Sequence, residues 1–157
     1  MKKYVIQALV IFMIGSAVGF LFNSVSPEGI SIIAAENKTL TGFRMVTTEE
    51  TQLYIKEGGN VILIDSRSPE EYFLGHIPGA INIPDGQVEE YFRKFEQKLR
   101  KAQLLIVYCS GGSCGTSEEV AKALISKGIS DSKVAVDQDG LPGWIRTKNP
   151  IETGAQK

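Results

Sequence analysis

A short loop of small residues contains both cysteines of this chain. The loop runs from Cys109 to Gly115, between an apolar run over residues 104–108 and a helical pattern over residues 116–124. A buried strand, adjacent glycines and a helix N-terminus bring backbone N–H groups together and favour negative charge there. A thiol at that point is expected to have a lowered pKa and to act as a nucleophile. The loop consists of Cys109, Ser110, Gly111, Gly112, Ser113, Cys114 and Gly115.

Both cysteines also have structural interpretations. Cys109 is the candidate nucleophile, and an inert buried cysteine at a strand end is its alternative. The pair Gly111–Gly112 favours the nucleophile, because an inert cysteine does not need converging N–H groups. Cys114 either fills the base of the loop or serves as a resolving thiol that closes on Cys109 as a disulfide. The spacing leaves both interpretations of Cys114 open.

A long motif between residues 65 and 84 resembles the N-terminal signature of the rhodanese (sulfurtransferase) family. In that family a strand that ends in a cysteine loop follows, as at Cys109, and a Trp-containing segment closes the domain, as at Trp144. The resemblance covers residues 43–154. The matching positions are Asp65, Arg67, Glu71, Tyr72, Gly75, His76, Ile77, Pro78, Gly79, Ala80, Asn82 and Pro84, and then Gly140, Trp144, Pro150 and Ile151.

The resemblance implies that Cys109 takes sulfane sulfur from a donor, carries it as a persulfide and passes it to a thiol or protein acceptor. It implies neither a cofactor nor a metal. Many members of the family have an Arg or Lys close to the cysteine, which helps to bind an anionic donor such as thiosulfate. Residues 110–117 contain no basic side chain, so we expect thiosulfate to be a poor donor. The resemblance assigns a structural role to Asp65, Arg67, Glu71 and His76.

The first 22 residues form a separate unit. Lys2 and Lys3 precede 19 uncharged residues, Tyr4 to Phe22, which are enough to cross ~30 Å of hydrocarbon as a helix. The basic end predicts a cytoplasmic N-terminus and a domain that faces the periplasm or the extracellular side. A cleaved signal peptide is the alternative. The predicted organisation is a membrane anchor or uncleaved signal over 1–22, a linker over 23–42 and the rhodanese-like domain over 43–154.

Apolar runs and amphipathic segments alternate along the third region. Strands are expected at residues 61–64, 80–83, 104–108 and 133–136. Helices are expected from a capping box at Thr47–Glu50 to Gly58–Gly59, at 69–74 with Pro69 at its start, at 86–101 and at 116–124. This alternation predicts an α/β domain whose parallel sheet is flanked by helices on both faces, in addition to the N-terminal transmembrane helix. In such sheets ligands bind beyond the C-terminal strand ends, where Cys109 lies.

Composition excludes some classes of protein. A net charge of −1 without a cluster of Lys and Arg gives no electrostatic basis for nucleic-acid binding. We therefore expect an extracytoplasmic, membrane-anchored sulfurtransferase whose nucleophile is Cys109. A non-catalytic binding module with the rhodanese fold and a thiol–disulfide exchanger that uses Cys109 and Cys114 are the alternatives.

Overall fold

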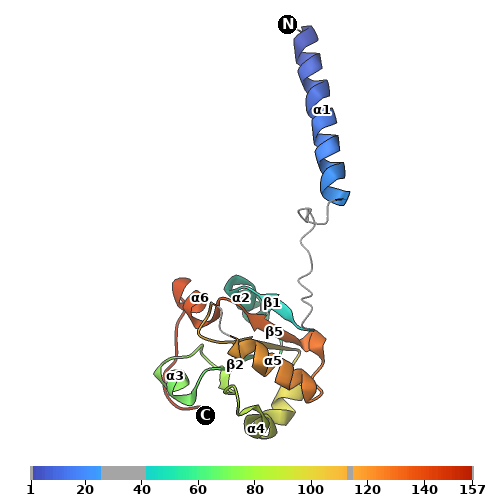
Figure 1. Ribbon diagram of the computed structural model, residues 1–157. Coiled ribbons are helices and arrows are strands. Elements are labelled where there is room, and N and C mark those ends of the chain that lie inside the picture. The colour runs from blue at the N-terminus through green and yellow to red at the C-terminus, as the bar shows by residue number, and fades with distance from the viewer. Residues whose placement is uncertain (1, 26–41, 113–114, 157) are drawn as a thin grey trace. The chain divides into compact units, whose positions relative to one another are not determined.

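The computed structural model describes residues 2–25, 42–112 and 115–156, which belong to two compact units divided after residue 36 (Figure 1). The described part of the first unit is helix α1 (Lys2–Val25), whose apolar side chains include the exposed Phe12 and Phe22. Among the described residues, no helix combines the length and hydropathy that crossing a membrane requires. The transmembrane helix predicted at Tyr4–Phe22 is therefore not supported by the structure. Most of the predicted linker, residues 26–41, lies outside the described residues.

The second unit is built on a five-stranded sheet in the order β1-β5-β4-β2-β3, and each pair of neighbouring strands is parallel. The central strand β4 is buried along its whole length, as expected for a parallel sheet covered on both faces. Cys109 therefore follows the most enclosed strand of the domain. The strands are β1 (Arg44–Val46), β2 (Val61–Asp65), β3 (Ile81–Asn82), β4 (Leu104–Tyr108) and β5 (Val134–Asp137).

Helices pack on both faces of this sheet (Figure 1). Leu105 and Val107 of β4 join the core beneath α4 and α5, whereas Ile106 and Tyr108 join the core beneath α2 and α6. This alternation follows from the period of two residues along a strand. The α/β fold with a parallel sheet flanked by helices is thus confirmed. The helices are α2 (Thr48–Glu57), α3 (Pro69–Leu74), α4 (Val88–Lys101), α5 (Thr116–Ser126) and α6 (Gly140–Arg146), with a short 3₁₀ helix η1 at Asp131–Lys133.

Two helix starts follow capping signals in the sequence. Thr47 and Glu50 form a capping box at the start of α2. Ser68 and Glu71 form a second capping box at the start of α3, with Pro69 in the first helical turn. Each box satisfies backbone N–H groups that a helix start otherwise leaves without partners.

A buried ion pair closes the connection between β2 and α3. Asp65 is fully buried, and its Oδ2 lies 2.5 Å from Nη2 of Arg67. The same Nη2 donates a hydrogen bond to the carbonyl oxygen of Gly75 at the end of α3. Burial opposes the charge of Arg67, but the hydrogen bond and charge of Asp65 outweigh it and raise the pKa of Arg67. The pair therefore ties both ends of α3 to the end of β2.

Asp65→Asn should lower the free energy of unfolding by about 3–5 kcal/mol, because it leaves the buried guanidinium of Arg67 without a counter-charge. Urea unfolding followed by the fluorescence of Trp144, the single tryptophan, measures the loss. Glu89→Gln is the matched control, since it neutralises an exposed carboxylate that pairs with Arg93 and Lys127, and it should leave the midpoint almost unchanged. Equal midpoints for the two variants would contradict the structural role of the buried pair.

Candidate active site

Cys109 lies at the carboxyl edge of the sheet, directly after β4. Its side chain is buried, with an exposed fraction of 2%. The hydroxyl of Ser117, in the first turn of α5, donates a hydrogen bond to Sγ of Cys109 over 3.6 Å. The sulfur is therefore positioned at the N-terminus of an 11-residue helix, where the helix dipole favours a thiolate.

Glycines allow the cysteine loop to pack directly on the start of α6. Gly111 and Gly112 have φ angles of 82° and 68°, and Gly140 at the start of α6 has a φ of 60°. A Cβ atom on Gly140 would lie 2.4 Å from the carbonyl oxygen of Cys109. That carbonyl oxygen accepts a hydrogen bond of 2.9 Å from the backbone N–H of Leu141. The backbone of Cys109 is thus fixed from the side of α6 as well as from β4.

Asp137, the last residue of β5, supports the start of α6. Its Oδ1 accepts hydrogen bonds from the backbone N–H groups of Asp139 and Gly140, and its Oδ2 accepts one from the hydroxyl of Thr51. Burial raises the pKa of Asp137, while these hydrogen bonds act in the opposite direction. A buried carboxylate with several donors holds Gly140 against the cysteine loop.

Ser66 links the ends of β2 and β4 to α5. Its hydroxyl donates a hydrogen bond to the carbonyl oxygen of Tyr108, and its Oγ lies 3.0 Å from Oγ1 of Thr116. Burial raises the pKa of Tyr108, whose hydroxyl accepts a hydrogen bond from the backbone N–H of Ile77. The residue before the candidate nucleophile is therefore fixed through both its backbone and its side chain.

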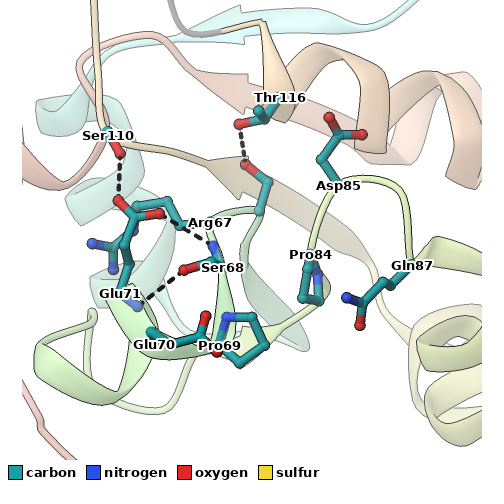
Figure 2. Close-up of a pocket in the computed structure, with 11 residues that line it drawn as sticks. Arg67, Ser68, Pro69, Glu70, Glu71, Pro84, Asp85, Gln87, Ser110 and Thr116 are labelled. Atoms are coloured by element: carbon teal, nitrogen blue, oxygen red, sulfur yellow. Dashed lines mark hydrogen bonds between the residues drawn. The ribbon is translucent and has the colours of Figure 1, made fainter.

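A cleft of about 460 Å³ opens beside the cysteine loop and is bordered by Ser110 of that loop and by Thr116, which follows it. The hydroxyl of Ser110 donates a hydrogen bond of 3.2 Å to Oε1 of Glu71, as Figure 2 shows. Glu71 therefore joins the loop to the start of α3. The cleft is lined by Ser66, Arg67, Ser68, Pro69, Glu70, Glu71, Pro84, Asp85, Gln87, Ser110 and Thr116.

The signature residues occupy different places around this site. Glu71 and Arg67 line the cleft, although the guanidinium of Arg67 is engaged by Asp65. His76 is buried and stacks on Tyr72, with ring centroids 3.7 Å apart, and neither it nor Asp65 lines the cleft. The predicted loop residues Ser113 and Cys114 lie outside the described residues.

Several residues of the site were not singled out in the sequence. Ser66 and Asp85 each follow a strand by a few positions, and such positions meet at the carboxyl edge of a parallel sheet. Ser117 lies in the first turn of a predicted helix, which was a usable signal. Glu70 gave no separate signal, because exposed acidic residues are common at helix starts.

Comparisons with known proteins identify relatives of this chain. The family described as "Rhodanese-like domain" matches residues 47–147. The chain is 31% identical over 114 residues to "Thiosulfate sulfurtransferase GlpE" of Pseudomonas syringae, covering 73% of this chain and 97% of that protein. It is 31% identical over 100 residues to "HTH-type transcriptional regulator Rv0324" of Mycobacterium tuberculosis, covering 64% of this chain but only 41% of that regulator.

A solved structure has the same fold. The crystal structure of the BH2092 protein from Bacillus halodurans superimposes with a TM-score of 0.61 and 23% identity, covering 70% of this chain and 77% of that one. At that identity the likeness concerns the fold alone.

Gly140→Ala should destabilise the domain and displace the cysteine loop. A left-handed φ costs a non-glycine residue about 1–2 kcal/mol, and the contact of the new Cβ with the loop backbone adds about 1–3 kcal/mol. Gly79→Ala is the matched control, because Gly79 has a φ of 77° but no atom within 4 Å of an added Cβ. Urea unfolding of both variants separates the two costs. Equal losses would contradict the close packing of Gly140 on the loop.

Proposed function

This chain belongs to the rhodanese-like domain family, and we propose that it is a sulfurtransferase that carries sulfane sulfur as a persulfide on Cys109. The observation that carries the proposal is the place of Cys109, at the end of the central strand and hydrogen-bonded by Ser117 at the start of α5. A helix N-terminus favours a thiolate and stabilises negative charge on a sulfur atom bound to it. The relative named as a thiosulfate sulfurtransferase is consistent with this chemistry.

The reaction has two displacement steps. The thiolate of Cys109 attacks the sulfane sulfur of a donor, the donor's sulfur–sulfur bond breaks, and the leaving group departs with the electron pair. The thiolate of an acceptor then attacks the terminal sulfur of the Cys109 persulfide, and the Cys109 thiolate leaves. Sulfur moves from donor to acceptor without an external oxidant or reductant. Fixed N–H dipoles around the loop stabilise the charge that the sulfur atoms carry in both steps.

Cys109→Ala should abolish both persulfide formation and multiple turnover, because it removes the nucleophile. The change replaces a small buried side chain by a smaller one, so the variant should remain folded. Transfer of sulfur from a polysulfide donor to a thiol acceptor is measured together with the urea midpoint. Ser126→Ala, at an exposed position at the far end of α5, is the control and should leave transfer unchanged. Undiminished transfer by a folded Cys109→Ala variant would refute the mechanism.

We also propose that residues 1–22 anchor the protein in a membrane, with the domain on the periplasmic or extracellular side. The support is in the sequence, where Lys2 and Lys3 precede the uncharged stretch from Tyr4 to Phe22. Positive charge on the N-terminal side of such a stretch favours a cytoplasmic N-terminus. A sulfur carrier in that location would meet donors and acceptors outside the cytoplasm.

The full chain, expressed in a bacterial host, should be found in the membrane fraction with its N-terminal segment attached. Replacing Ile11 and Phe12 together by Lys should release it, because charge at the centre of a span is strongly disfavoured. Replacing the same two residues by Leu is the matched control and should keep the protein in membranes. Intact mass and protease protection of the domain in intact cells complete the experiment. A shortened product in the soluble fraction would instead indicate a cleaved signal peptide.

A further inference from the structure

The cleft beside the cysteine loop has an acidic lining. Glu70, Glu71 and Asp85 contribute carboxylates, and Arg67 is the only basic residue among the described residues that line it. The guanidinium of Arg67 is already bound by Asp65 and by the carbonyl oxygen of Gly75. The cleft beside the cysteine loop therefore offers negative charge to a ligand that enters it.

The three carboxylates take part in no ion pair within the described part of the chain, but Glu71 differs from the other two in its hydrogen bonds. Glu71 accepts hydrogen bonds from Ser68 and Ser110. Its carboxylate therefore positions the cysteine loop relative to the start of α3. Within the described part of the chain, the side chains of Glu70 and Asp85 take part in no ion pair. Carboxylates at the rim of a cleft steer cations toward it and repel anions. Their charge is complementary to a basic ligand.

An apolar surface continues from the same cleft along α3. Phe73 and Leu74 are 56% and 76% exposed, and because they are adjacent they form a patch rather than single exposed side chains. With Pro69 and Glu70 they line a second, largely apolar hollow of about 370 Å³. Because Pro69 and Glu70 also line the cleft beside the cysteine loop, the two hollows form one continuous surface.

We propose that the sulfur acceptor is a cysteine in a basic and apolar polypeptide segment, which lies across the acidic cleft and the apolar hollow of α3. The inference rests on the proposed sulfurtransferase function. A small anionic thiol is repelled by Glu70 and Asp85 and has nothing to place against Leu74. An anionic lipid surface is disfavoured by the same carboxylates. In such a polypeptide, basic side chains pair with the carboxylates of the cleft and apolar side chains pack in the hollow of α3. Its cysteine thiolate can then reach the cysteine loop.

The chemistry is the second step of the proposed reaction. The acceptor's cysteine thiolate attacks the terminal sulfur of the Cys109 persulfide, and the bond between that sulfur and Sγ of Cys109 breaks. The electron pair of this bond returns to Cys109 as a thiolate, and the acceptor leaves as a persulfide. The carboxylates of Glu70 and Asp85 lower the energy of this encounter only when the acceptor carries positive charge.

Three synthetic peptides test the proposal on the full chain after it has been loaded with sulfur from a polysulfide. The sequences are Lys-Leu-Gly-Cys-Gly-Leu-Lys, its Glu counterpart Glu-Leu-Gly-Cys-Gly-Leu-Glu, and Lys-Gly-Gly-Cys-Gly-Gly-Lys. The rate of persulfide discharge per peptide thiolate should be at least about five-fold higher for the first peptide than for the second. It should be at least about three-fold higher for the first than for the third, because leucine side chains become buried on Phe73 and Leu74.

Variants assign each preference to its residues. Glu70→Gln combined with Asp85→Asn should bring the rates of the Lys and Glu peptides close to each other, mainly by accelerating the Glu peptide. Leu74→Ser combined with Phe73→Ser should remove the preference for leucine over glycine. Because each comparison is a ratio on one protein preparation, partial unfolding does not affect it. Glu57→Gln and Leu53→Ser are controls on exposed positions of α2, and both should leave the ratios unchanged.

The outcomes separate the inference from the function on which it rests. A protein that forms no persulfide refutes the proposed function. A protein that loads and discharges sulfur equally to all three peptides retains that function and overturns the inference. A concentration-dependent dimer that Leu74→Ser abolishes would assign the apolar hollow to a second copy of the chain and would also overturn it.

Discussion

The absence of a side chain at Gly140 is the constraint on which the site depends. The first residue of α6 lies so close to the cysteine loop that a Cβ atom there would overlap the carbonyl oxygen of Cys109. This contact lets Leu141 donate its backbone hydrogen bond to Cys109, and it places α6 over the end of β4. Asp137 then secures the start of α6 through two backbone N–H groups. The position of the candidate nucleophile is thus set by backbone packing.

A second set of contacts assembles the cleft on the other side of the loop. The ion pair of Asp65 and Arg67 fixes the start and end of α3 relative to β2. With α3 in place, Glu71 accepts the hydrogen bond of Ser110, and Glu70 and Glu71 line the cleft. The buried charges of Asp65 and Arg67 therefore hold the cleft in shape, while the exposed carboxylate of Glu70 is available to a ligand.

Much of the fold could be predicted from the sequence, because its signals are local. Apolar runs predicted β2, β4 and β5, the capping box at Thr47 predicted the start of α2, and Pro69 predicted the start of α3, where the structure adds a capping box at Ser68. Strand β1 was missed because three residues are too few to show a period. The candidate nucleophile Cys109 was predicted from its loop and from the family resemblance. The acidic cleft was not found, since Glu70 and Asp85 come from separate connections and meet only in the folded chain.

The central claim is that Cys109 carries sulfane sulfur. Intact mass of the full chain after exposure to a polysulfide and removal of excess donor, followed by peptide mapping, tests it most directly. The account predicts a gain of one sulfur atom that maps to Cys109 and disappears when a thiol is added. An unchanged mass, or a loss of two hydrogen atoms that maps to a disulfide between Cys109 and Cys114, would contradict it.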